Sequence, residues 1–210
     1  MAGFDYIFEL FTLLLGLAMA EVLGGFAMLL KLRGRQRAGV DPSVAHVHIG
    51  WLVPLLGAMI LLDQSTFWLR MYDLREVLWL SDGSVVAVLI LIGAYYLLAS
   101  LIVPDVHEIW ADFDAYYFAH RRLIIGGALL IGLLVSIGEG MLPSPPGAAA
   151  ALARVDPKLE AAQMLLELVQ LVALVWALFT LRPRLSAWLL GATVAAQLAT
   201  AGLTIATPGM

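Results

Sequence analysis

Long apolar stretches separated by short polar segments organise the chain. A helix needs about 20 mostly apolar residues to cross the ~30 Å hydrocarbon core of a bilayer, and six stretches are long enough. The predicted spans cover residues 4–30, 49–71, 84–103, 123–142, 159–181 and 185–206. None alternates apolar and polar residues with the period of two that a transmembrane strand needs. The pattern therefore predicts an all-α, polytopic membrane protein, with six transmembrane helices in one bundle and a single domain over residues 1–210.

The connecting segments predict the orientation of the bundle. Eight Lys and Arg residues lie in the first, third and fifth connections, against four in or beside the second and fourth. Because cytoplasmic loops carry an excess of Lys and Arg, both termini are expected outside in a plasma (inner) membrane protein. The third connection, residues 105–122, is predicted to be an amphipathic cytoplasmic loop, since it mixes aromatic and acidic residues. Asp156 followed by Pro157 predicts an N-cap and the start of the fifth span.

Composition excludes several classes of protein. Hydrophobic residues make up 62% of the chain and charged residues 13%, against roughly a quarter in an ordinary soluble domain. The mean hydropathy of +0.93 is too high for a water-soluble domain, so a lipid bilayer is the expected surroundings. The formal net charge of −4, without a basic face, excludes a nucleic-acid partner. Because the chain has no cysteine, disulfides and thiolate metal sites are excluded too.

Acidic residues inside the predicted spans provide the one chemical signal. Glu9 and Glu21 lie in the first span, Asp63 in the second and Glu167 in the fifth. An ionisable group in hydrocarbon costs ~2.5–3.5 kcal/mol on insertion scales, so each of these acids is expected to have a structural or functional role that offsets this cost. The interiors of the spans are expected to contain no Lys or Arg, which rules out internal salt bridges. The acids must therefore be protonated, hold a cation or face water.

These acids predict a channel or transporter that conducts protons or small cations. Asp63 and Glu167 would form the acidic site at the midplane, with Glu9 as a relay toward the outside and Glu21 toward the inside. The predicted transport site also includes three polar residues of the spans: Tyr95, Gln170 and Gln197. An alternative stays open, in which each acid is protonated and hydrogen-bonded to another helix for structural reasons. The protein would then be a non-catalytic scaffold or an accessory subunit of a larger membrane complex.

The sequence gives little support for catalysis or for cofactor binding. The chain contains no G-x-S-x-G nucleophile motif, phosphate-binding loop or H-E-x-x-H zinc motif. The four histidines lie near span ends, so no pair is expected to hold a haem inside the bundle. His46 and His48 could bind a metal only with ligands from elsewhere. The third connection offers nitrogen and oxygen ligands from His107, Glu108, Asp112 and Asp114. No catalytic residue, metal or cofactor is predicted, and an enzyme is the less favoured class.

Two faces of small residues favour close helix contacts. Gly16 and Ala20 are four residues apart on the first span, and the sixth span repeats the spacing with Gly191, Ala195 and Ala199. Such faces let helix backbones approach closely, either within one chain or between subunits. Contact between subunits would make the protein a homo-oligomer or a partner of another membrane protein.

Overall fold

The computed structural model describes residues 2–39, 42, 45–74, 82–104, 110–142 and 156–206. That part of the chain forms six helices: α1 (Ala2–Ala38), α2 (Leu52–Leu74), α3 (Asp82–Ser100), α4 (Phe113–Met141), α6 (Pro157–Phe179) and α7 (Pro183–Ala206). Five are long and apolar enough to cross a membrane, and the apolar stretch of α3, Val85–Ser100, is shorter. The described residues contain no β-strand, so the prediction of an all-α, multi-pass membrane bundle is confirmed.

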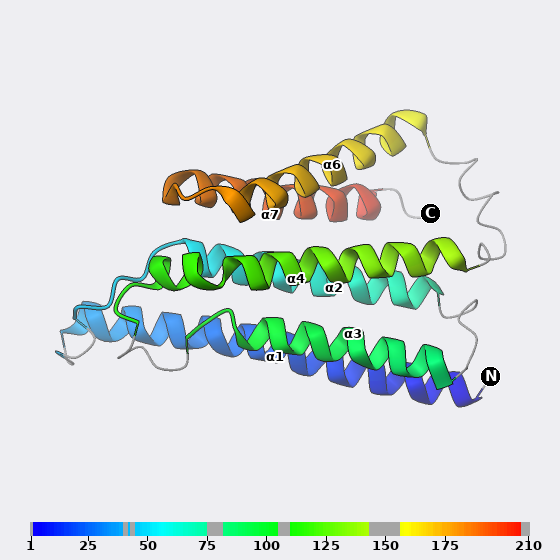
Figure 1. Ribbon diagram of the computed structural model, residues 1–210, viewed down its shortest axis with the longest axis horizontal. Coiled ribbons are helices and arrows are strands. Elements are labelled where there is room, and N and C mark those ends of the chain that lie inside the picture. Colours follow the sequence, from blue (N-terminus) through cyan, green and yellow to red (C-terminus); the bar gives the residue numbers. More distant parts are fainter. Residues whose placement is uncertain are drawn as a thin grey trace.

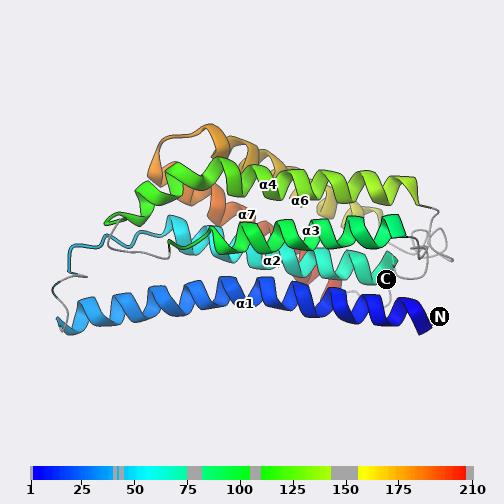
Figure 2. The same ribbon diagram turned by 60° about the horizontal axis from the view of Figure 1, so that its bottom comes forward.

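The helices form three tiers, with α1 beside α3, α2 beside α4 and α6 beside α7 (Figure 1). Successive helices alternate in direction, so α1, α3 and α6 end where α2, α4 and α7 begin (Figures 1 and 2). We call this end of the bundle the basic end. Its basic residues on or beside the helices are Lys31, Arg33, Arg35, Arg37, Arg121, Arg122, Arg182 and Arg184. Helix α2 is central, because it packs against α1, α3, α4 and α7.

Apolar side chains cover both the inside and the outside of the bundle. On α1, Phe11, Leu15 and Val22 recur at helical spacing and are buried. Leu13, on another face of the same helix, is 71% exposed. Lipid tails are as apolar as leucine, so an outward leucine is as well placed in a bilayer as an inward one.

Helix α1 continues through the first basic residues instead of ending at residue 30. Lys, Leu, Arg and Gln have good helix propensity, so the helix can extend past the hydrocarbon into the polar region. It ends at Ala38, and Gly39 follows with φ +61°. Glycine adopts this left-handed conformation without the steric penalty of a Cβ atom and is common directly after a helix.

Helix α4 begins at Phe113, so most of the predicted loop 105–122 is helical; residues 105–109 lie outside the described residues. Asp112 caps the helix, since its Oδ1 accepts a hydrogen bond of 2.9 Å from the N–H of Asp114. Arg121 therefore belongs to α4, and Arg70 belongs to α2. The expectation of spans without basic residues is wrong at Arg70, which already lies within the predicted span 49–71, and at Arg121, because α4 begins ten residues before the predicted span 123–142.

The predicted start of the fifth span is confirmed in α6. Asp156 is the N-cap residue, and its Oδ1 accepts a hydrogen bond of 2.9 Å from the N–H of Lys158. Pro157 occupies the first helical position, where its missing N–H leaves no hydrogen bond unmade.

Two adjacent glycines of α1 should respond oppositely to substitution. A Cβ at Gly25 would lie 2.7 Å from Cγ2 of Val103, whereas a Cβ at Gly24 would meet nothing within 4 Å. Gly25→Ala should lose about 1–3 kcal/mol of unfolding free energy through overpacking. Gly24→Ala should be neutral or gain up to about 1 kcal/mol, because alanine favours helix. Thermal unfolding in detergent, followed by circular dichroism, measures both; equal melting temperatures would contradict the packing of α1 on Val103.

Candidate functional site

Asp63 and Tyr95 form a hydrogen-bonded pair between α2 and α3. The Tyr95 hydroxyl donates to Oδ2 of Asp63 at 2.8 Å, and Tyr95 is buried. Aromatic rings surround the pair, since Phe67 lies against Tyr95 with ring centroids 5.0 Å apart and Phe11 lies against Phe67. The structure thus brings together two of the residues predicted for the transport site.

Two further polar side chains are buried in the bundle, one on α2 and one on α7. Gln64 is 0% exposed, and in the described part of the chain neither its amide nitrogen nor its oxygen has a hydrogen-bond partner. Gln197 of α7 is also buried, and its Oε1 is unpartnered there too. Both helices start at the basic end, and the two amides lie roughly 18–21 Å from those starts at 1.5 Å of rise per residue.

The remaining predicted site residues do not join Asp63. Glu9 and Glu21 are exposed on α1, and Glu167 is exposed on α6. Gln170 is only partly buried on α6. The structure therefore places three of the four predicted acids on the outside of the bundle and one between helices.

Arg70 and Glu139 extend the polar contacts of α2 away from the basic end. Nη1 of Arg70 lies 4.0 Å from Oε2 of Glu139 on α4, and both side chains are partly exposed. Arg70 follows Asp63 by about two helical turns, which places the two on one face of α2. It is close enough for its charge to act on the Asp63 carboxyl. Neither residue of this ion pair was among the predicted site residues.

Arg121 is a buried cation at the basic end. It is 2% exposed, and its Nη1 donates to the carbonyl of Thr180, the C-cap residue of α6. Its guanidinium also lies over the ring of Phe118, 4.9 Å from the centroid. The C-terminus of a helix carries partial negative charge, so it stabilises a cation without needing a carboxylate. Arg121 thereby fastens the start of α4 to the turn between α6 and α7.

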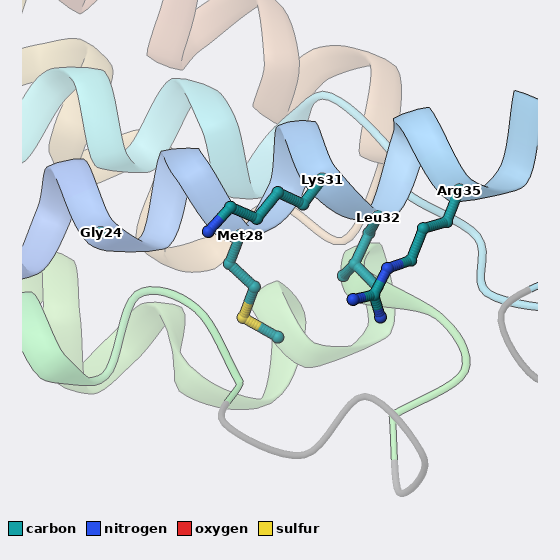
Figure 3. Close-up of a pocket in the computed structure, with 5 residues that line it drawn as sticks. All are labelled: Gly24, Met28, Lys31, Leu32 and Arg35. Atoms are coloured by element: carbon teal, nitrogen blue, oxygen red, sulfur yellow. The ribbon is translucent and has the colours of Figure 1, made fainter.

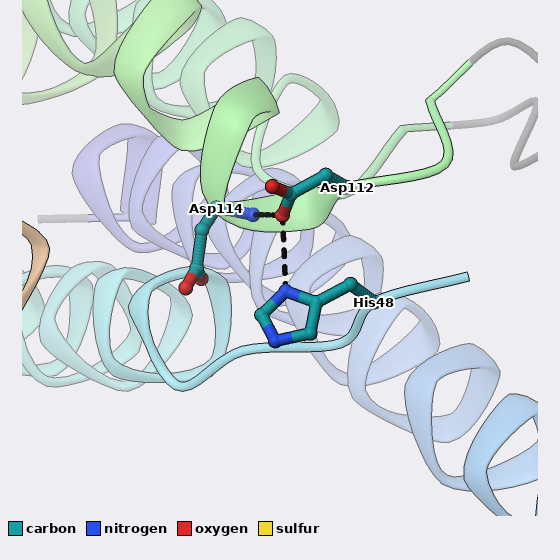
Figure 4. A group of neighbouring side chains, drawn as sticks. All are labelled: His48, Asp112 and Asp114. Carbon is teal, nitrogen blue, oxygen red and sulfur yellow. Dashed lines mark hydrogen bonds and ion pairs between the residues drawn. The ribbon is translucent and has the colours of Figure 1, made fainter. Parts of the chain in front are cut away.

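His48, Asp112 and Asp114 gather where the connection before α2 meets the start of α4 (Figure 4). Nδ1 of His48 lies 3.1 Å from Oδ1 of Asp112. The two backbones form an isolated β-bridge, in which the His48 N–H donates to Ala111 and the Phe113 N–H donates to His48. One ligand atom from each of the three side chains lies within 4.8 Å of the others, a spacing that could hold a metal ion.

Helix capping accounts for the Asp112 carboxylate, whereas Oδ1 of Asp114 is buried without a hydrogen-bond partner in the described part of the chain. Asp112 caps α4, and Asp114 accepts a hydrogen bond from the backbone of Leu52 at the start of α2. Burial disfavours the charged form of Asp112. The hydrogen bonds from His48 and from the backbone N–H groups of Asp114 and Ala115 outweigh it and hold the pKa of Asp112 below its ordinary value. The cluster joins two helix starts, and the sequence could not reveal it because His48 and Asp112 are 64 residues apart.

Comparison with known proteins adds no match to this geometry. The chain matches no protein-family model, no curated protein and no solved structure.

The Asp112–His48 contact should stabilise the fold in a pH-dependent way. Because the folded-state pKa of Asp112 is depressed, its contribution is present at neutral pH and is lost as pH falls through that pKa. Asp112→Asn, which can still cap α4, should unfold at a lower temperature than the wild type at pH 7, with the difference shrinking in acid. Asp112→Ala also loses the cap, worth about 0.5–2 kcal/mol, and should stay less stable at every pH. Melting curves of the wild type and both variants between pH 3 and pH 8 check this prediction. The range extends roughly one unit beyond the ordinary carboxyl and histidine pKa values. A melting-temperature difference between Asp112→Asn and the wild type that does not change with pH would refute the electrostatic origin.

Proposed function

We propose that the bundle transfers protons across the membrane through its interior, past Asp63. The observation that carries this proposal is the Asp63–Tyr95 hydrogen bond between α2, which is long enough to cross a membrane, and α3. An intramembrane carboxyl is costly and commonly marks an ion or proton pathway. A carboxyl and a phenol hydroxyl can both exchange protons, so the pair suits proton transfer.

The same chemistry favours a proton over a metal cation. Hard cations such as Ca²⁺ and Mg²⁺ take about six or more oxygen ligands. Around Asp63, the described hydrogen bonds supply one carboxylate and one hydroxyl. The aromatic rings of Phe67 and Phe11 offer no further ligand oxygen.

Polar residues near Asp63 support a path through the bundle. Arg70 and Glu139 lie away from the basic end, and Gln64 of α2 and Gln197 of α7 are buried at about the depth of Asp63. A buried amide without a partner costs about 1–3 kcal/mol. Water commonly partners such groups in protein interiors. Water at these amides would give protons a way through α2 and its neighbours.

The proposal predicts that Asp63→Asn abolishes proton flux. The amide oxygen can still accept the Tyr95 hydrogen bond, so the fold should persist while the exchangeable carboxyl proton is lost. Tyr95→Phe should reduce flux, and Glu167→Gln, an equally conservative change at an exposed carboxyl, should leave it unchanged. The measurement is the fluorescence of a pH-sensitive dye inside liposomes that contain the purified protein, with a potassium diffusion potential driving proton entry.

Two results would overturn proton transfer through Asp63. One is proton flux at the wild-type level in an Asp63→Asn variant that elutes from size exclusion as the wild type does. The other is no flux above protein-free liposomes for the wild type itself. Loss of proton flux in both single variants, Glu167→Gln and Asp63→Asn, would instead add Glu167 to the proton pathway.

A second candidate function, an accessory subunit of a membrane complex, is favoured by what lies on the outside of the bundle. Glu21 and Glu167 are exposed near the middles of apolar helices, where lipid would surround their carboxyls. The predicted small-residue faces also point outward: Gly16, Ala20, Ala195 and Ala199 are exposed and Gly191 is partly buried. A protein partner could cover these features, which do not pack inside the chain.

The accessory function predicts a discrete protein neighbour at the small-residue face of α7. A photoreactive benzophenone residue at Ala195 should, on illumination of native membranes, give one cross-linked protein adduct that mass spectrometry can identify. The same residue at Trp188, which is 79% exposed, serves as the control position. Labelling of lipid alone at position 195 would contradict a partner on this face.

A further inference from the structure

A pocket opens on α1 near the basic end (Figure 3). Gly24, Met28, Lys31, Leu32 and Arg35 line it, and its volume is about 230 Å³. The described lining residues combine two cations with apolar side chains, and none of them is a carboxylate. In Figure 3 the side chains of Lys31 and Arg35 reach back along the helix toward Met28 and Leu32.

The length of α1 places the two cations at the level of lipid headgroups. Its 37 residues extend about 55 Å, well beyond the ~30 Å hydrocarbon core. Lys31 and Arg35 lie within about two turns of the helix end at Ala38, or about 10 Å along its axis. Gly24 lies about two turns deeper, which places the apolar part of the pocket toward the hydrocarbon.

Gly24 creates the open part of the pocket. A Cβ at Gly24 would meet nothing within 4 Å, although the neighbouring Gly25 packs tightly on Val103. The space at Gly24 therefore faces away from that packed contact. A larger side chain at this position would occupy the pocket without displacing a neighbouring helix.

Lys31 and Arg35 are available to a ligand, whereas the cation between them is not. Arg33 donates to the carbonyls of Ile49 and Gly50 and lies over the ring of Trp51. Among the described residues, Lys31 and Arg35 have no hydrogen bond or ion pair. They point two positive charges at one pocket.

We propose that this pocket binds the phosphate headgroup of an anionic phospholipid. Arg and Lys form charge-assisted hydrogen bonds with phosphate oxygens. Clusters of basic residues at membrane level attract anionic lipids. The pocket is too small for a whole phospholipid, so the acyl chains lie along the apolar surface of α1 beyond Met28. Net negative charge on the headgroup balances the two cations, which selects an anionic lipid over a zwitterionic one.

The test is native mass spectrometry of the full chain in detergent, titrated with phosphatidylglycerol or with phosphatidylcholine of the same acyl chains. The wild type should bind phosphatidylglycerol more tightly than phosphatidylcholine. The double variant Lys31→Gln/Arg35→Gln should weaken phosphatidylglycerol binding about tenfold or more and leave phosphatidylcholine binding unchanged. Gly24→Leu, which fills the pocket, should weaken binding of the same lipid while both charges remain.

Matched variants outside the pocket are the controls. Arg37→Gln removes a charge from the same helix, and Gly34→Leu adds a side chain where a Cβ also meets nothing within 4 Å. Both should bind phosphatidylglycerol as the wild type does. Equal binding of the two lipids by the wild type would overturn the proposal, as would unchanged binding in the double variant. Full displacement of the lipid by glycerol 3-phosphate would overturn it too, because the site would then bind a soluble anion.

Discussion

In hydrocarbon a polar group without a partner is costly, and no water is at hand to supply one. This constraint makes every described span a helix, in which the backbone satisfies its own hydrogen bonds. It also explains the few polar side chains that enter the bundle with partners. Tyr95 donates to Asp63, and Arg121 donates to the carbonyl of Thr180 at the end of α6. In each case the polar group joins two elements that are distant in sequence.

Polar groups lie both at the basic end and in the interior of the bundle. At the basic end, His48, Asp112 and Asp114 tie the starts of α2 and α4 together, and Arg33 holds the connection before α2. These groups have defined structural roles as caps and links. In the interior, the buried amides of Gln64 and Gln197 retain unpartnered atoms within the described part of the chain. Asp114 Oδ1 and Arg121 Nε at the basic end are buried without a partner in the same part of the chain, so unpartnered atoms do not by themselves separate the two sets.

The outer surface of the bundle has polar and small residues among its apolar ones. Most of it is leucine-rich, as a lipid-facing surface should be. Against that background, Glu21 and Glu167 are carboxyls on apolar helices, and the small-residue faces lie uncovered. The pocket at Gly24 adds two cations at headgroup level. The accessory-subunit proposal concerns the first set and the lipid proposal concerns the second, so the two proposals involve different parts of the bundle surface.

Sequence by itself determined the membrane class, the six apolar helices and the N-cap at Asp156, because hydrophobic length and local capping are properties of consecutive residues. It also selected Asp63, Tyr95 and Gln197 as polar residues within spans. It could not show that Asp63 meets Tyr95, that Gln64 is buried or that Glu21 and Glu167 face outward. The lipid-facing and inward-facing sides of these helices are equally apolar. The positions of the apolar residues therefore do not show which side of a helix faces the interior of the bundle. Only tertiary packing decided those directions, since α2 can place Asp63 against one neighbour and Gln64 against another once its surrounding helices are in position.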